Sequence, residues 1–255
     1  GAGINSGEGF LADAIRLATR GWKFEVYSWD AACHTQLKEF AEKNGKFYDS
    51  LGGRMIVPII DPLGRVVAFG GRLMEKSDFA KYKNTKETLL FVKNRTLFNL
   101  NNVKELTRTQ KINNIIIVEG YMDVIALHQA GFDNAVASLG TSFTSGHASL
   151  LKRYTKEVYL TFDSDDAGIK AALRAIPILK EVGLVAKVIN MKPYKDPDDF
   201  IKALGSEEYQ KRIDNAENSF LFEIRIVLFQ PRNSRRHAMP MHNFGIIWQI
   251  HVINI

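Results

Sequence analysis

The stretch IIIVEGYMD, residues Ile115–Asp123, decides the fold of this chain together with TFDSDDAG, residues Thr161–Gly168. In each stretch an apolar run typical of a buried strand ends in carboxylates and a glycine. Buried strands of this kind belong to parallel sheets, and open α/β sheets bind ligands at the carboxyl ends of their strands. We therefore expect Glu119, Asp163 and Asp165 to gather around a divalent cation at one edge of a sheet.

Around these motifs, strand-like and helix-like stretches alternate. Strands are expected over residues 114–118, 134–138, 157–162 and 184–190, and helices over 121–130, 145–154, 167–181 and 198–204, the last ending at Gly205. This alternation predicts right-handed βαβ units and a parallel sheet. The expected fold class is therefore α/β over residues 112–205, a parallel sheet flanked by helices.

Upstream, residues 46–111 are expected to form a smaller mixed, β-containing (α+β) subdomain. MIVPII and RVVAFGGR flank the turn sequence Asp61–Gly64, which predicts a β-hairpin. The formal charge of residues 46–111 is +7, whereas that of residues 112–223 is −4. Basic side chains suit phosphate-bearing partners and clustered carboxylates suit a hard cation, so the two parts complement each other.

The bulk composition excludes several classes of protein. The single cysteine, Cys33, excludes an internal disulfide framework and a structural zinc site built from several cysteines. The sequence has no apolar run of about 18 residues and no secretory signal pattern, so we expect a cytoplasmic protein without a membrane span.

Each acidic motif also has a purely structural interpretation. Glu119 could be an exposed acid near a helix start, and Ser164 or Asp166 could cap the following helix. An EF-hand fails, because its twelfth position would be Arg174 instead of a bidentate glutamate. In KDPDD, residues 195–199, Asp followed by Pro favours a helix start, with Asp196 and Asp198 as further candidate metal ligands.

Taken in order, EGYMD (119–123), SLGT (138–141), DSD with AG (163–168) and KDPD (195–198) resemble the TOPRIM module of bacterial DNA primases of the DnaG type. GRMIVPIIDPLGRVVAFGGR (53–72) and KYKNTKETLLFVK (81–93) resemble the amino-terminal half of the same polymerase domain. The resemblance covers about residues 46–223 and implies a TOPRIM-type sheet.

The resemblance also implies a function: RNA primer synthesis from ribonucleoside triphosphates on single-stranded DNA during replication. It implies that Glu119, Asp163 and Asp165 are catalytic and bind Mg²⁺ or Mn²⁺, with Asp196 and Asp198 as further metal ligands. The positions implied to contact template or nucleotide are Arg54, Arg72, Lys81, Asn84 and Lys93. A replicative helicase is an implied partner, although its contacting domain and the preceding zinc module are not seen in this sequence.

The two ends of the chain fit the resemblance less well. Residues 1–45 form a small α/β segment with a weak resemblance to NYN-type nucleases, which are PIN relatives. Residues 206–223 read as the start of a helical segment, and residues 224–255 form a basic tail with no assignment. We therefore expect a fragment or a hybrid chain.

Two rival functions remain open. A TOPRIM or NYN nuclease would use the same ion to cleave phosphodiesters. A truncated module would bind metal and nucleic acid but make no product.

Overall fold

The computed structural model describes residues 42–43, 46–47, 51–75 and 78–229. Most of the predicted segment 1–45, and the basic tail beyond residue 229, lie outside the described residues. The chain divides into two compact units, residues 1–219 and 220–255. In the described part of the second unit the backbone forms α8 (Ser219–Phe229), which begins at the last residue of the first unit.

The first unit is built around a five-stranded sheet in the order β10-β9-β8-β6-β7. Its four parallel strands are β6 (Asn114–Val118), β7 (Ala135–Ala137), β8 (Glu157–Leu160) and β9 (Val185–Val188). The short strand β10 (Glu217–Asn218) pairs antiparallel with β9. All four parallel strands were predicted, and the α/β class with a parallel sheet is confirmed.

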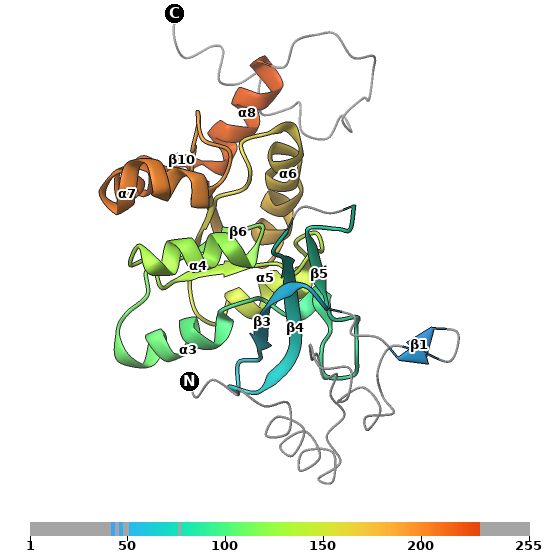
Figure 1. The fold of residues 1–255 in the computed structure, drawn as a ribbon. Helices are drawn as coiled ribbons and strands as arrows, with labels where there is room; N and C mark the ends of the chain where they lie inside the picture. Colours follow the sequence, from blue (N-terminus) through green and yellow to red (C-terminus); the bar gives the residue numbers. More distant parts are fainter. Residues whose placement is uncertain (1–41, 44–45, 48–50, 76–77, 230–255) are drawn as a thin grey trace, which may run out of the picture. The chain divides into compact units, whose positions relative to one another are not determined.

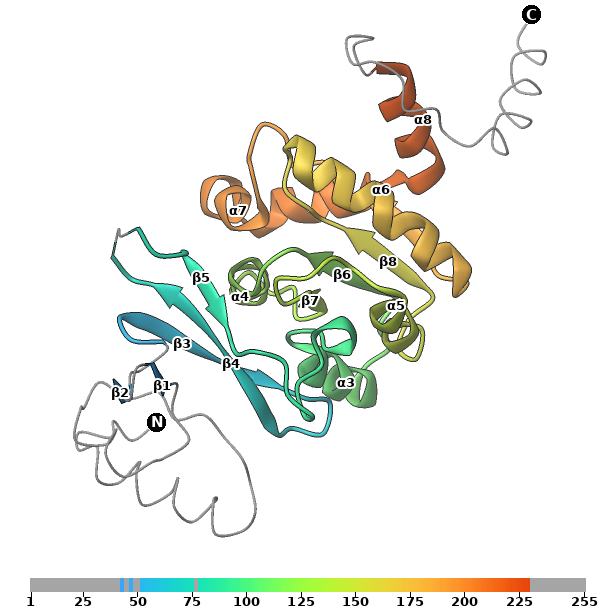
Figure 2. The same ribbon diagram turned by 90° about the vertical axis from the view of Figure 1, so that its right-hand side faces the viewer.

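Helices cover both faces of this sheet (Figure 2). One layer holds α4 (Tyr121–Gln129) and α7 (Pro197–Asp214), which contact each other, and the other holds α5 (Ser145–Leu151) and α6 (Asp166–Glu181). The predicted end of a helix at Gly205 is a kink inside α7, where Gly205 has φ 77° and the helix then resumes. Glycine adopts this left-handed conformation without the steric cost that a Cβ would bring.

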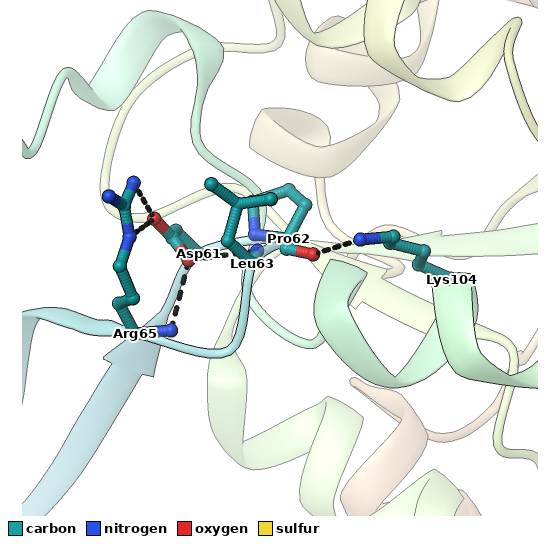
Figure 3. A network of polar contacts seen from close by, with 5 residues as sticks. All are labelled: Asp61, Pro62, Leu63, Arg65 and Lys104. Carbon is teal, nitrogen blue, oxygen red and sulfur yellow. Dashed lines mark hydrogen bonds and ion pairs between the residues drawn. The ribbon is translucent and has the colours of Figure 1, made fainter.

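A second sheet of three antiparallel strands, β3 (Arg54–Ile60), β4 (Val66–Leu73) and β5 (Tyr82–Asn84), precedes the first along the chain (Figure 1). The predicted hairpin joins β3 to β4. In its turn the Asp61 carboxylate accepts hydrogen bonds from the backbone N–H groups of Leu63 and Arg65 and pairs with the Arg65 guanidinium at 2.6 Å (Figure 3). Lys104 Nζ donates to the Pro62 carbonyl at 2.7 Å, which fastens the turn to α3 (Leu100–Thr109).

Several shorter elements had not been predicted. They are β5, α3, β10, the 3₁₀ turn η1 (Lys93–Arg95) and the small pair β1 (Glu42–Lys43) and β2 (Lys46–Phe47). None of the helices in the described part of the chain combines the length and the apolar character that crossing a bilayer requires.

The apolar core explains why the sheet forms. Residues 115–118 of β6 are completely buried, as expected for the centre of a sheet covered on both faces. On one face, Ile116 and Val118 pack in a cluster with Leu127 of α4 and Phe200 of α7. A second cluster includes residues of β3 and β4 together with Tyr121, so the start of α4 packs beside the hairpin sheet.

Candidate active site

The acidic residues lie where the direction of the chain through the sheet reverses. Strands β6 and β8 are parallel neighbours, yet the chain leaves β6 into α4 on one face and leaves β8 into α6 on the other. Such a switch point opens a crevice at the carboxyl ends of the two strands. Glu119 follows β6 and Asp163 follows β8, and the Asp163 backbone N–H donates to Glu119 Oε1 at 3.1 Å. The structure therefore brings these two predicted residues together.

The acids raise one another's proton affinity. The pKa of Glu119 is raised mainly by partial burial of its carboxyl group, and further by the charges of Asp163 and Asp165. The side chain as a whole is still exposed to solvent, so the shift is limited. The pKa of Asp163 is raised by burial and by Asp196, against the opposing effect of Lys195, whose Nζ lies 3.5 Å from Asp163 Oδ2. Excess negative charge of this kind is what a bound cation would relieve.

Asp165 has a structural task in addition to its predicted one. Its Oδ1 accepts hydrogen bonds from the backbone N–H groups of Ala167 at 2.9 Å and Gly168 at 3.0 Å, so it caps α6. Both bonds reach Oδ1, and Asp165 Oδ2 forms no hydrogen bond within the described part of the chain. A helix cap had been considered at Ser164 or Asp166, one residue to either side.

Gly168 is required at its position. A Cβ there would lie 2.7 Å from the carbonyl carbon and 2.8 Å from the nitrogen of Asp163, both backbone atoms, and closer still to the Asp163 oxygen. The absence of a side chain allows the first turn of α6 to pack directly onto the end of β8. This contact fixes Asp163 against the helix.

The third acidic segment, residues 195–199, starts a helix, as one of its two interpretations predicted, and also lies near the other acids. Asp196 caps α7 by accepting from the Asp199 N–H at 2.8 Å, which is the structural role considered from the sequence. Its charge also raises the pKa of Asp163, so the Asp196 carboxylate is close to the site. Asp198 pairs with Lys202 at 2.6 Å, and its charge contributes to the raised pKa of Asp123. The Ser164 N–H donates to the Lys195 carbonyl at 2.8 Å and joins this loop to the end of β8.

Asp123 belongs to the cluster, although the sequence prediction did not include it among the site residues. It lies in the first turn of α4, where its Oδ2 accepts from the Gly120 N–H at 3.3 Å. Burial and the charges of Asp196 and Asp163 raise its pKa to about 7. The sequence did contain a signal for Asp123, because it is the last residue of the motif EGYMD. About one helical turn after Glu119, its side chain points back toward the same site.

The chemistry of these donors fits a hard divalent cation. Carboxylate oxygens are the ligands that Mg²⁺ prefers, and Mg²⁺ commonly takes one or two carboxylates together with waters and substrate phosphates. Across the described ranges, no three His, Cys, Asp or Glu side chains are close enough together to hold an ion by themselves. Within the described residues the acids therefore fit an ion that also takes ligands from outside the protein, such as phosphate oxygens, and they do not form an all-protein cage.

The five predicted nucleic-acid-binding residues lie in different environments. Arg54 is buried, and its guanidinium donates to the carbonyls of Gly71, Ala80 and Lys81 at 2.7–3.3 Å. Arg54 therefore joins β3 to β4 and to the β4–β5 connection through hydrogen bonds. Its predicted contact with template stays a prediction.

Arg72 lies in β4 and Asn84 in β5. Asn84 Nδ2 donates to the Leu139 carbonyl at 3.2 Å, which joins β5 to the loop after β7. Four buried side-chain polar atoms have no partner within the described residues, and three of them are Arg72 Nε, Asn84 Oδ1 and the Tyr121 hydroxyl. Buried polar atoms are usually hydrogen-bonded, so these three could be satisfied by a polar ligand.

Lys81 and Lys93, the two lysines predicted to bind nucleic acid, differ in their surroundings. Lys81 is exposed, with its Nζ 5.5 Å from the centroid of the Tyr82 ring. The Lys93 carbonyl lies 2.7 Å from Nε2 of the buried His147, so the backbone around Lys93 is anchored to α5.

A parallel sheet with acids at its switch point, joined to a basic antiparallel sheet, defines a Toprim-like domain with a companion domain. Comparison with known families supports this class: a family described as Toprim-like matches residues 116–201. A family described as the N-terminal domain of the DNA primase catalytic core matches residues 9–104, and so includes much of the stretch with the weak NYN-like resemblance.

Individual proteins that are similar to this chain are also DNA primases. The DNA primase of Clostridium acetobutylicum is 43% identical over 175 residues, covering 69% of this chain and 29% of that protein. The DNA primase of Aquifex aeolicus is 39% identical over 176 residues, 69% of this chain and 35% of that protein. The solved primase catalytic core of E. coli has a TM-score of 0.71 at 30% identity, over 88% of this chain and 79% of that one.

The chain belongs to the bacterial DNA primases of the DnaG type. It spans about a third of the length of these two curated relatives. A DnaG primase catalytic domain solved with bound single-stranded DNA is also similar, with a TM-score of 0.71 at 30% identity over 88% of this chain and 77% of that one.

Proposed function

We propose that this chain is the catalytic core of a DNA primase, which joins ribonucleoside triphosphates into short RNA primers on single-stranded DNA. The observation that supports this most is the meeting of Glu119 and Asp163 at the switch point of a Toprim-like sheet. The match of residues 9–104 to a primase domain favours this function over the nuclease alternative, because a nuclease would have no need of that domain.

The reaction joins a 3′-hydroxyl oxygen to the α-phosphorus of a nucleotide and releases pyrophosphate. Asp163 and Asp165 would hold Mg²⁺ or Mn²⁺, with Asp196 and Asp198 at the margin. A divalent ion in such a site neutralises phosphate charge and lowers the pKa of the attacking hydroxyl. Glu119, whose pKa is raised, is suited to take the hydroxyl proton, because a base works best when its pKa lies near the working pH.

The basic sheet would supply the nucleic-acid contacts. Arg72, Lys81, Asn84 and Lys93 are the proposed contacts to template or nucleotide, and Tyr82 beside Lys81 offers an aromatic surface. Aromatic and basic side chains together are a common means of holding single strands. Arg54 would act by tying β3 to the strand connection that carries Lys81. A replicative helicase is the further proposed partner, and the cytoplasm the proposed location.

The test supplies single-stranded DNA, labelled ribonucleoside triphosphates and Mg²⁺, and measures RNA products. Asp163→Asn and Asp165→Asn should each reduce the primer yield about a hundredfold or more. Asparagine at position 165 keeps the helix cap, so loss of activity there would not reflect a frayed α6. Asp166→Asn, an exposed acid in the same turn, is the matched control and should remain within a few-fold of the parent chain.

The alternatives give distinct results. Equal primer yields from the parent chain and Asp163→Asn would refute the proposal. Metal-dependent loss of intact nucleic acid without added nucleotides would indicate a nuclease. Salt-sensitive DNA binding without any product would indicate a module that only binds.

A further inference from the structure

A second feature lies on the other side of Glu119 from α4. Between the loop after β7 and helix α6 is a pocket of about 290 Å³. Its wall is formed by Glu119, Ser138, Gly140, Thr141, Ser142, Phe143, Phe162, Ala167, Ala171 and Arg174. This volume lies at the lower end for small-molecule sites, so it suits a compact ligand and not a segment of protein.

Several polar side chains of the pocket have no partner within the described residues, whereas Glu119 accepts a hydrogen bond from the Asp163 N–H. Thr141 Oγ1 is buried without a partner. Within the residues that the structure describes, Arg174 and the hydroxyl of Ser138 form no hydrogen bond or ion pair either. A buried hydroxyl without a partner carries a free-energy cost, which a ligand with hydrogen-bonding groups would remove.

Two phenylalanine rings give the pocket an apolar surface, and both are held by neighbouring buried residues. The Phe143 ring lies 5.5 Å from the ring of His147, which is completely buried and held by the Lys93 carbonyl. Phe162 precedes Asp163 directly and follows Thr161, whose hydroxyl contacts Tyr209 of α7 on the opposite face. Since side chains alternate along a strand, Phe162 faces the α6 side and the pocket.

We propose that this pocket binds the nucleoside end, base and ribose, of a ribonucleotide whose phosphates lie at the acidic centre. Flat rings fit against Phe143 and Phe162, and the hydroxyls of Ser138 and Thr141 suit the base edge or the ribose. The Arg174 guanidinium suits a base edge that presents acceptors.

The charge of the pocket argues against the opposite orientation, in which the phosphates of the nucleotide would lie in the pocket. Among the described residues that line it, only Glu119 and Arg174 are charged, so a polyphosphate inside would meet a carboxylate without a net positive charge to offset it. The neutral end of the nucleotide meets no such repulsion. Since Glu119 borders both the pocket and the acidic centre, one nucleotide can reach from one to the other.

This inference rests on the proposed primase function, but its test does not require primer synthesis. The 255-residue chain is titrated with each of the four ribonucleosides, which carry no phosphate, in the presence of a chelator, and amide NMR shifts report binding. Shifts should concentrate on Gly140, Thr141 and Phe162. Arg174→Met, which keeps an unbranched stem, and Ala171→Leu, which fills the pocket, should each weaken binding about tenfold or more.

Lys170→Met, an exposed cation on α6 that does not line the pocket, is the matched control and should leave binding within twofold. In the primer assay, Arg174→Met should raise the nucleotide KM by about tenfold while kcat changes less. Equal nucleoside affinity in the parent chain and both pocket variants would overturn the proposal. So would binding of inorganic phosphate at these amides without binding of any nucleoside.

The two proposals fail separately. Nucleoside binding that depends on Arg174, together with primer yields unaffected by Asp163→Asn, would support the pocket and refute the primase assignment. Primer synthesis lost in Asp163→Asn, with nucleotide KM unchanged in Arg174→Met and Ala171→Leu, would support the primase assignment and refute the pocket.

Discussion

Replacing Asp123 with asparagine tests whether the acids at the switch point strain the fold when no cation is bound. The carboxyl is largely buried and faces the charges of Asp196 and Asp163, and its pKa is raised from 3.8 to about 7. In the unfolded chain Asp123 loses its proton near pH 4. Between pH 4 and 7 the folded state therefore binds more protons than the unfolded state, and this group lowers stability as the pH rises.

The size of the effect follows from the shift in pKa. About three pH units at roughly 1.36 kcal/mol each give an upper bound of about 4 kcal/mol, reached above pH 7. Asparagine keeps an oxygen for the hydrogen bond from the Gly120 N–H and carries no charge at any pH. We expect Asp123→Asn to raise the free energy of unfolding by about 2–4 kcal/mol at pH 8, and to change it little at pH 4.

Urea denaturation at pH 4, 6 and 8 with a chelator present measures this difference. Asp166→Asn, at an exposed position in the first turn of α6, is the control and should show no comparable rise with pH. A second titration with added Mg²⁺ should narrow the gap at pH 8, because a bound cation offsets the charge of the parent chain. If Asp123→Asn is no more stable than the parent at pH 8 without a cation, the electrostatic reasoning is refuted.

Substitutions at three further positions test how the structure holds the site. Gly168→Ala should destabilise by about 1–3 kcal/mol in urea denaturation, because overlap with the Asp163 backbone outweighs the gain in helix propensity of about 1 kcal/mol; a stabilised variant would contradict the close approach. Arg54→Met should lower the unfolding free energy by about 2–4 kcal/mol in calorimetry, because three carbonyl groups each lose one donor, although the Lys81 carbonyl keeps that of the Leu73 N–H. An unchanged Tm would contradict this. Asp165→Ala should cost about 1 kcal/mol and Asp165→Asn much less, measured by thermal melts; equal losses would exclude a capping role.

Much of the sheet could be predicted because its signals are local. Residues 115–118 form an unbroken apolar run, and the turn Asp61–Gly64 contains residues suited to a tight reversal. The meeting of Glu119 with Asp163 followed from the rule that parallel strands end at one edge. Strand β10 and helix α3 were not predicted, since a two-residue pairing and a start at Asn99 with φ 69° leave little trace in the sequence.

The site was predicted less completely, because burial and hydrogen-bond partners depend on the whole fold. Arg54 and Lys81 read alike as cations, yet one is buried against three carbonyls and the other is exposed. Asp123 entered the cluster only because α4 turns its side chain toward Asp196. Arg174 had been used only to exclude an EF-hand, and no spacing rule linked it to Thr141 across the pocket.

The edges of the five-stranded sheet bear on how the chain behaves in concentrated solution. Its outermost strands, β7 and β10, have only three and two residues. On the β7 side, Phe98 exchanges backbone hydrogen bonds with Ala137 at 2.9 and 3.4 Å and so occupies groups that another chain could pair with. Two short edges, one of them occupied, offer little template for strand addition, so this sheet resists growth into intermolecular aggregates.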